Sequence, residues 1–269
     1  MSENAFFREP DPGRIDQGMN PTQIALVTGG NRGLGKNMAL HLADAGFDLV
    51  ITYRGEVPED VLSALRGKGR KAAALRLDVA DSRSFGAFAE SLRAELQKTW
   101  GRDRFDALVN NAGIGIHASF AETTEEQFDQ LMNVHLKGTF FLAQKLLPLL
   151  ADGGRIVNVS TGLARFATPG YSAYASMKGG VEVLSRYMAK ELGPRGISVN
   201  VLAPGAIETD FGGGAVRDNA GLNKMIADQT ALGRVGLPDD VGGAIVALLS
   251  PGAKWITGQR IEASGGMYL

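Results

Sequence analysis

Tyr174 and Lys178 are the side chains of this sequence whose types and spacing best suit proton transfer. They stand four residues apart in a stretch, 171–192, whose pattern predicts a helix, so they should share one helix face, one turn apart. A free tyrosine has a pKa of about 10 and is a poor acid or base near neutrality, but a nearby ammonium lowers that pKa. The pair can therefore pass a proton to or from a hydroxyl or carbonyl oxygen. Taken alone, the same spacing also occurs in two exposed residues.

Two hydroxyl side chains, Ser160 and Thr161, lie at the end of an apolar stretch that predicts a strand over 155–160. A hydroxyl at that end can hydrogen-bond a substrate oxygen and orient it beside the tyrosine. A serine nucleophile is the competing interpretation, but the sequence has no G-x-S-x-G turn and no base is identified for it. No metal site is expected, because no ligands pair with the three scattered histidines, which are His41, His117 and His135.

The stretch Thr28 to Gly35 predicts a phosphate-binding turn. It lies between an apolar run, 24–27, and a helical pattern, which is the order of a strand, a glycine turn and a helix start. Glycine lets a backbone come close to a phosphate, and a helix N-terminus offers unpaired N–H groups. The spacing of Gly29, Gly33 and Gly35 is not G-x-G-x-x-G, and glycine turns also serve packing. The place of this turn after the first predicted strand favours a dinucleotide.

The residues at the end of the second predicted strand favour NADP(H) over NAD(H). NAD-selective sites usually have a carboxylate there, about 20 residues after the glycine turn, to bind the ribose 2′-hydroxyl. This sequence has Tyr53 and Arg54 at that place, and Arg32 lies inside the glycine loop. Two guanidinium groups without a carboxylate suit a 2′-phosphate. Two solvated surface arginines are the alternative, under which NAD(H) would serve as well.

Apolar runs and helical patterns alternate along the chain, which predicts a parallel sheet with helices on both faces. Strands are expected at 24–27, 48–53, 72–77, 107–109, 155–160, 197–202 and 259–263. Helical patterns follow the glycine turn and cover 58–68, 82–98, 124–150, 171–192 and 238–249. The predicted fold class is therefore α/β, a single-domain, Rossmann-type doubly wound sheet of about seven strands over 21–269. Residues 1–20 are expected to form a mobile N-terminal tail.

Length and composition agree with one large domain of this kind. The chain has 269 residues, of which 44% are hydrophobic, and a net charge of −1. No basic field suits nucleic acid, and no apolar run is long enough to cross a membrane. The sequence has no cysteine, which excludes disulfides and thiolate metal sites. The acidic N-terminus lacks the apolar core of a signal peptide, so we expect a cytoplasmic protein that acts on a small molecule.

Four motifs, in order and spacing, resemble the short-chain dehydrogenase/reductase family over about residues 22–269. They are T-G-x3-G-x-G at Thr28 to Gly35, N-N-A-G at Asn110 to Gly113, Y-x3-K at Tyr174 and Lys178, and P-G-x-I-x-T at Pro204 to Thr209. The resemblance implies an oxidoreductase that moves a hydride between the nicotinamide C4 and a carbonyl or alcohol carbon. It also implies that Tyr174 gives or takes the proton, while Lys178 holds the nicotinamide ribose and lowers the tyrosine pKa.

The same resemblance implies which residues line the cofactor cleft. Ile207 and Thr209 would touch the carboxamide, and Asp78 and Val79 would border the adenine. The expected cofactor-binding set is Gly29, Asn31, Arg32, Gly33, Leu34, Gly35, Tyr53, Arg54, Asp78, Val79, Asn111, Ala112, Gly113, Tyr174, Lys178, Pro204, Gly205, Ile207 and Thr209. Family members are commonly tetramers that pair two long helices, so we expect a homotetramer, with a dimer as the alternative.

Two positions depart from the family pattern. The catalytic serine usually lies thirteen residues before the tyrosine, where this chain has Thr161, and Ser160 is the fallback if the loop is shifted. The catalytic asparagine usually lies in a V-N-L-x-G-like segment, where this chain has His135. In the family this position holds, largely through its backbone carbonyl, a water that links the lysine to solvent. His135 is either a neutral replacement or an added titrating group in that relay.

The substrate is the part of the function that the sequence does not name. Residues 206–232 are expected to form a lid whose start is flexible at Gly212 to Gly214. Its apolar inner face is expected to consist of Phe211, Leu222, Met225 and Ile226. This suggests an apolar or mixed ketone, with a 3-oxoacyl thioester, a steroid, a sugar and a small ketone all open. The favoured hypothesis is an NADPH-dependent carbonyl reductase. The alternatives are an NAD-dependent alcohol dehydrogenase working oxidatively and a non-catalytic dinucleotide-sensing module, against which the intact Tyr174–Lys178 pair argues.

Overall fold

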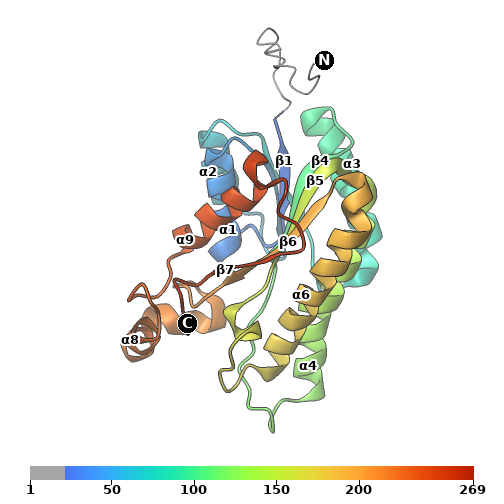
Figure 1. Ribbon diagram of the computed structural model, residues 1–269. Helices are drawn as coiled ribbons and strands as arrows, with labels where there is room; N and C mark the ends of the chain where they lie inside the picture. The colour runs from blue at the N-terminus through green and yellow to red at the C-terminus, as the bar shows by residue number, and fades with distance from the viewer. Residues whose placement is uncertain (1–21) are drawn as a thin grey trace, which may run out of the picture.

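Seven parallel strands form one sheet in the computed structural model, which describes residues 22–269. Their order across the sheet is β3-β2-β1-β4-β5-β6-β7 (Figure 1). The direction of this order reverses between β1 and β4, and ligands of such sheets bind beyond the carboxyl ends of the strands at that point. The strands are β1 (Ile24–Val27), β2 (Asp48–Tyr53), β3 (Ala72–Arg76), β4 (Phe105–Asn110), β5 (Leu150–Val159), β6 (Ser198–Pro204) and β7 (Arg260–Ala263). The tail predicted over 1–20 lies outside the described residues.

Two layers of helices cover the sheet, one on each face, as Figure 1 shows. One hydrophobic core lies between the sheet and α1 (Gly33–Asp44), α2 (Glu59–Gly67) and α9 (Pro238–Leu249). The other lies between the sheet and α3 (Phe85–Trp100), α5 (Gly138–Leu146) and α6 (Ser172–Leu192). Successive side chains of a strand point to opposite faces, so Val27 of β1 packs in the first core and Leu26 in the second. The predicted doubly wound α/β sheet is confirmed.

The helix predicted over 124–150 is the element that differs most from its prediction. It begins as expected, because Thr124 caps α4 (Glu125–Leu131) in a reciprocal arrangement with Gln127. After α4 the chain passes through a π-helical turn, Met132–Lys137, before it continues as α5. A π-helical turn inside a helix often marks a functional site. The turn here brings His135 into the candidate site described below.

The same helix also ends earlier than predicted. Pro148 lies in the 3₁₀ turn that follows α5, and proline supplies no backbone N–H to continue an α-helix. The strand that follows therefore starts at Leu150, five residues before its predicted start. Its carboxyl end, where the predicted hydroxyl residues stand, is unaffected.

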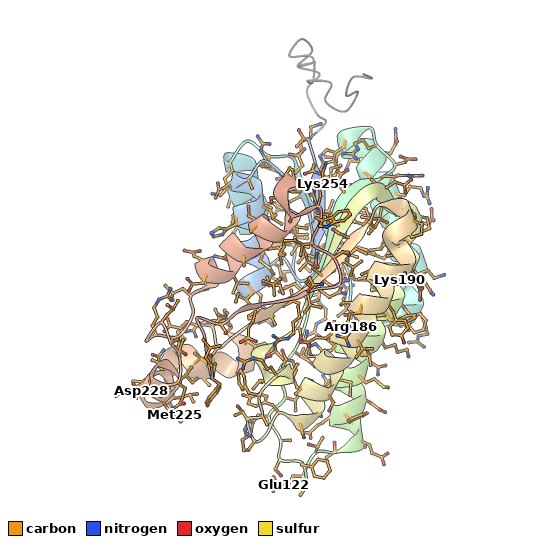
Figure 2. All side chains as sticks on the ribbon, viewed as in Figure 1. Glu122, Arg186, Lys190, Met225, Asp228 and Lys254 are labelled. Atoms are coloured by element: carbon orange, nitrogen blue, oxygen red, sulfur yellow. The ribbon has the colours of Figure 1, made fainter. Side chains whose placement is uncertain are left out.

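The stretch predicted as a lid, 206–232, contains two short helices, α7 (Ala215–Asp218) and α8 (Ala220–Asp228). They follow three glycines, Gly212 to Gly214, whose φ angles are 62°, 75° and 79°. This is the left-handed conformation, which residues other than glycine disfavour. Figure 2 shows α8, which carries Met225 and Asp228, projecting beyond the same end of the molecule as the loop with Glu122. Within 22–269, none of the helices combines the length and the apolar character needed to cross a membrane.

Candidate active site

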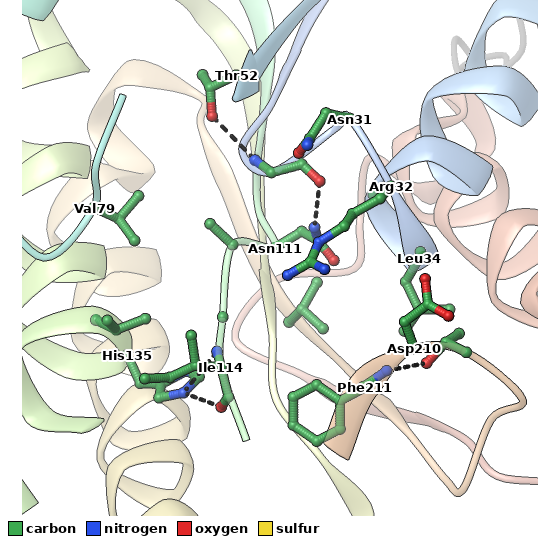
Figure 3. A pocket seen from close by; sticks show the side chains of 18 of the residues that line it. Asn31, Arg32, Leu34, Thr52, Val79, Asn111, Ile114, His135, Asp210 and Phe211 are labelled. Carbon is green, nitrogen blue, oxygen red and sulfur yellow. Dashed lines mark hydrogen bonds between the residues drawn. The ribbon is translucent and has the colours of Figure 1, made fainter. Parts of the chain in front are cut away.

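A cavity of about 580 Å³ opens at the carboxyl ends of the strands, where the strand order reverses. Its lining contains every residue that the sequence predicts for catalysis or cofactor binding, from Gly29 to Thr209. Figure 3 shows part of this lining, with the glycine loop on one side and His135 and Phe211 at the other. The structure therefore brings segments distant in the sequence around one space. Among residues 22–269, no three histidine or carboxylate side chains gather as a metal ion would require.

The glycine loop fits closely against the loop that follows β4. Gly29 has a φ of 63°, and its N–H donates to Thr52 Oγ1 at 3.0 Å. A Cβ at Gly35 would strike the carbonyl oxygen of Gly29 and would lie 2.5 Å from Asn111 Nδ2. Asn111 Nδ2 also donates to the carbonyl oxygen of Thr28 at 2.9 Å, which joins the two loops. Glycine is therefore required at position 35 by the close approach of its surroundings.

The start of α1 offers backbone N–H groups to the cavity. Arg32 is its N-cap residue, no side chain caps the first turn, and no acidic residue lies in that turn. An uncapped helix N-terminus has free N–H donors and the positive end of the helix dipole. These features, together with the space that glycine leaves at position 35, fit the diphosphate of a dinucleotide.

Two arginines line the cavity next to this helix start. Within the described part of the chain, the guanidinium groups of Arg32 and Arg54 have no hydrogen-bond or ion-pair partner. Figure 3 shows Arg32 extending from the glycine loop into the cavity. Arg76 on β3 donates to the carbonyl oxygen of Arg54 at 3.2 Å and adds a further positive charge nearby. Tyr53, not a carboxylate, ends β2 here, so this end of the cavity is positively charged.

Tyr174 lies deep in the cavity, with only 6% of its surface exposed. The rings of His135 and Phe211 are its neighbours, with centroid distances of 5.1 Å and 5.7 Å. Burial raises the pKa of the phenol above its ordinary value of 10.0, while the side chain of Thr161 opposes that rise. The direction of this shift is therefore opposite to the lowering that the spacing of Tyr174 and Lys178 predicts. The phenol is therefore protonated near neutrality, which is the form that donates a proton.

Lys178 lies one turn further along α6 and is equally buried. Its Nζ donates to the carbonyl oxygen of Val159 at 2.7 Å and lies 5.9 Å from the centre of the Tyr174 ring. Burial lowers the pKa of the ammonium from 10.5 to about 8. The lysine is therefore mainly charged at neutral pH, and its charge would be sensitive to a modest rise in pH.

The hydroxyls of Ser160 and Thr161 have different partners. Ser160 Oγ donates to Glu182 Oε1 on α6 at 2.7 Å. Thr161 Oγ1 accepts from the backbone N–H of Leu163 at 3.3 Å, and Thr161 lines the cavity with Tyr174, whose raised pKa its side chain opposes. Thr161 is thus the hydroxyl that the structure brings to the tyrosine, while Ser160 is already engaged in a second contact.

His135 is buried in the π-helical turn, with 1% of its surface exposed. Its Nε2 donates to the carbonyl oxygen of Ile114 at 2.8 Å, because a carbonyl can only accept. Its Nδ1 has no partner among residues 22–269. Burial, followed by the positive charge of Lys178, lowers the pKa of this imidazole from 6.5 to about 3. The ring is therefore neutral near neutrality, which favours the neutral replacement over the titrating relay group.

The cavity also has lining residues that the predicted site does not contain: Thr52, Gly55, Leu77, Ile114, Val134, Val159, Asp210 and Phe211. Phe211 is the most informative of them. A Cβ on Gly115, in the loop after β4, would lie 2.9 Å from its Cζ. The Phe211 ring therefore reaches from the lid to that loop and covers the side of the cavity next to Tyr174. The sequence places Phe211 on the apolar inner face of the predicted lid, outside the predicted catalytic and cofactor-binding set.

Known proteins resemble this chain along nearly all of the described residues. The model of the family described as "Enoyl-(Acyl carrier protein) reductase" matches residues 29–268. The 3-oxoacyl-[acyl-carrier-protein] reductase FabG of Staphylococcus aureus is 35% identical over 255 residues, which cover 93% of this chain and 100% of that protein.

Two solved structures are also similar to it. One is the reductase LugOII, described as "Promiscuous Reductase LugOII Catalyzes Keto-reduction at C1 during Lugdunomycin Biosynthesis". It matches with a TM-score of 0.87 and 34% identity over 93% of this chain and 99% of that chain. The other is the ketoreductase LanV, described as "The crystal structure of angucycline C-6 ketoreductase LanV with bound NADP". It matches with a TM-score of 0.87 and 33% identity over 93% of this chain and 97% of that chain.

Proposed function

The chain belongs to the short-chain dehydrogenase/reductase family, whose members are oxidoreductases that act on C=O and CH–OH groups, and we propose that it reduces a ketone to a secondary alcohol with NADPH. The observation that carries this proposal is the buried phenol of Tyr174, which lies near Lys178 and lines the cavity together with Thr161. A protonated phenol suits the reductive direction, because the carbonyl oxygen must gain a proton. LugOII is described as catalysing keto-reduction and LanV as a ketoreductase, which supports the reductive direction for this chain.

In the proposed reaction, Tyr174 gives its phenolic proton to the substrate oxygen while the Thr161 hydroxyl orients that oxygen by a hydrogen bond. Bound NADPH would supply the hydride that the carbonyl carbon gains. A C–H bond and an O–H bond form as the C=O π bond breaks, so the product is a secondary alcohol. The ammonium of Lys178 stabilises the phenolate that is left, which then regains a proton from solvent.

His135 has a positioning role in this proposal. Its Nε2–H holds the carbonyl oxygen of Ile114, and its own carbonyl oxygen accepts from Thr139 Oγ1 at 2.7 Å. The edge of its ring packs against Tyr174 at an interplanar angle of 86°. We therefore assign to His135 the placement of the β4 loop and of the phenol, with no change of its own charge during turnover.

The preference for NADP(H) rests on Arg32 and Arg54. Arg32 lies in the glycine loop, Arg54 directly follows β2, both line the cavity, and neither guanidinium has another partner within residues 22–269. Guanidinium binds phosphate with paired, charge-assisted hydrogen bonds. The solved relative LanV contains bound NADP, in agreement with this assignment. An NAD-dependent alcohol dehydrogenase would have no use for two free positive charges at this place.

The aromatic surroundings of Tyr174 favour a flat, largely apolar ketone as substrate. Phe211 covers the phenol from the lid, and Tyr171 lies beside it with a ring distance of 6.4 Å. Aromatic side chains bind flat rings through stacked or edge contacts. A 3-oxoacyl thioester is the second candidate, because the Staphylococcus aureus relative is named as a 3-oxoacyl-[acyl-carrier-protein] reductase.

A homotetramer remains our proposal for the assembly. Large apolar side chains are exposed on the outer faces of α5 and α6, namely Phe140, Phe141, Val183 and Tyr187. Exposed apolar patches of this kind mark protein interfaces. Size-exclusion chromatography with light scattering would give the mass of the assembly, and a monomer would refute this proposal.

A cofactor titration and a ketone screen test the proposed function together. Fluorescence titration should give a lower Kd for NADPH than for NADH, and an equal or lower Kd for NADH would overturn the NADP(H) assignment. NADPH oxidation is then followed with a panel of cyclic aromatic ketones, small aliphatic ketones and acyl thioesters. Turnover of the cyclic ketones would support the favoured substrate class, and turnover of acyl thioesters alone would support the second. Tight binding of NADPH without oxidation of any of them would favour the non-catalytic alternative.

A further inference from the structure

An arginine of the last strand forms hydrogen bonds with the turn that carries Thr161. Arg260 Nη2, on β7, donates to the carbonyl oxygen of Thr161 at 3.0 Å. Arg260 Nε donates to Glu182 Oε1 on α6 at 2.8 Å, and the same oxygen accepts from Ser160 Oγ at 2.7 Å. One guanidinium therefore holds both residues of the turn, Thr161 directly and Ser160 through Glu182.

A second arginine completes this network on the other side of the turn. Arg165 follows the 3₁₀ turn that begins at Gly162, and it binds Glu262 of β7 with contacts of 2.7 Å and 2.9 Å. Glu262 also accepts from Arg260 Nη1 at 2.6 Å. The pKa of Glu262 is lowered to about 2, mainly by Arg165, so this carboxylate is charged at every pH at which the protein would work. The residues on both sides of Thr161 are thus joined to β7, Ser160 through Glu182 to Arg260 and Arg165 directly to Glu262.

The charged side chains of this network are largely buried, which restricts their movement. The side chains of Arg260, Glu182 and Glu262 are 23%, 13% and 17% exposed. Exposed ion pairs contribute little to stability, whereas partly buried pairs that share several hydrogen bonds fix orientation more strongly. None of these side chains belongs to the predicted site, and the substrate oxygen would not touch them.

We propose that Arg260 is a positioning residue, which holds the Thr161 turn so that the threonine hydroxyl meets the phenol of Tyr174. This inference rests on the proposed function, because it matters only if Tyr174 and Thr161 carry the proton transfer. It also gives Ser160 a role: its hydroxyl anchors the turn to Glu182 and is not the one presented to substrate.

The test is a double-mutant cycle with a matched control. Arg260→Met removes every donor and keeps the apolar stem, and it should lower kcat with the NADPH Kd unchanged. The expected loss lies between about ten-fold and about a hundred-fold, because a misplacement of about 1 Å can cost that much. In the Arg260→Met/Thr161→Val double variant, the loss should be no greater than in Thr161→Val alone, since the position of an absent hydroxyl has no effect.

Arg102→Met is the control, because Arg102 makes a comparable network at the opposite end of the sheet. It binds Asp106 at 2.8 Å and 3.0 Å and the carbonyl oxygen of Thr22 at 3.2 Å, and its side chain is 27% exposed. This variant should lose a similar amount of thermal stability and keep its kcat. If Arg260→Met slows turnover no more than Arg102→Met does, the positioning role is wrong.

Rescue by a conservative variant provides a second readout that a general loss of stability would not move. Arg260→Lys keeps the positive charge and one donor group, so it should restore part of the kcat that Arg260→Met loses. Losses that multiply in the double variant, or a kcat of Arg260→Lys no higher than that of Arg260→Met, would overturn the inference. Full turnover in Thr161→Val would instead refute the proposed function.

Discussion

Replacing His135 by asparagine, the residue of the family motif, should remove one defined acid-sensitive contribution to folding stability. The buried imidazole is held neutral in the folded protein, where its pKa is lowered to about 3 from an ordinary value of 6.5. Between these two values the unfolded chain binds a proton that the folded chain does not. Stability contributed by this group is therefore fully present above about pH 6.5 and is lost progressively as the pH falls towards 3.

The magnitude follows from the difference between the two pKa values. One pKa unit corresponds to about 1.4 kcal/mol, so a fall from pH 7.5 to about pH 5 should remove about 2 kcal/mol of the free energy of unfolding. This figure depends on the ordinary pKa of histidine and hardly on the folded value, provided that the latter stays well below 5. An asparagine at this position does not titrate and should lack this loss.

The assay is urea unfolding of the wild type and of His135→Asn at both pH values, with His135→Gln as a second variant of different size. The wild type and the variants share all other titrating groups. The difference between their pH-dependent losses of unfolding free energy therefore reports the His135 imidazole alone. Equal losses in wild type and both variants would refute a buried, neutral His135. The pH–rate profile gives a further check, because a group that stays neutral contributes no ionisation to it near neutrality.

Four further variants test other parts of the site. Arg32→Ser and Arg54→Ser should each raise the Kd of NADPH by about ten-fold and leave that of NADH nearly unchanged, because each removes one charge-assisted phosphate contact; equal weakening of both cofactors would contradict this. Gly35→Ala should keep the far-ultraviolet circular dichroism of the fold and lose NADPH binding, since its Cβ would strike the neighbouring glycine carbonyl, whereas Gly86→Ala, on α3 outside the cavity lining and with open space around it, should bind normally. Phe211→Ala should lower kcat/KM for cyclic ketones by about ten-fold through lost apolar contact, while kcat/KM for acetone should change little. An equal loss for both substrates would argue against a Phe211 ring that faces the substrate.

The sheet and the place of the site could be predicted from the sequence because both depend on local patterns. Strands such as Asp48–Tyr53 are short apolar runs between turn residues, and their observed bounds agree with those predicted. In a parallel sheet all carboxyl ends lie on one side, so the glycine loop and Tyr174 had to meet there once the alternation of strands and helices was recognised.

Other features depend on contacts that no local pattern reports. The choice between Ser160 and Thr161 is made by Glu182 and Arg260, the latter 100 positions after Ser160, and only the folded chain brings these groups together. The raised pKa of Tyr174 follows from its burial, which the spacing of Tyr174 and Lys178 does not report. The π-helical turn at Met132–Lys137 likewise has no composition that separates it from an ordinary helix.

The most direct test of the central claim is Tyr174→Phe, which removes one oxygen atom from the centre of the cavity. The variant should bind NADPH with an unchanged Kd, because the glycine loop and the arginines are intact. Its single-turnover rate of NADPH oxidation, measured with a ketone that the wild type reduces, should fall by at least about 100-fold, as expected for the loss of a general acid. A rate close to that of the wild type would show that the proton comes from another group and would contradict the proposed mechanism.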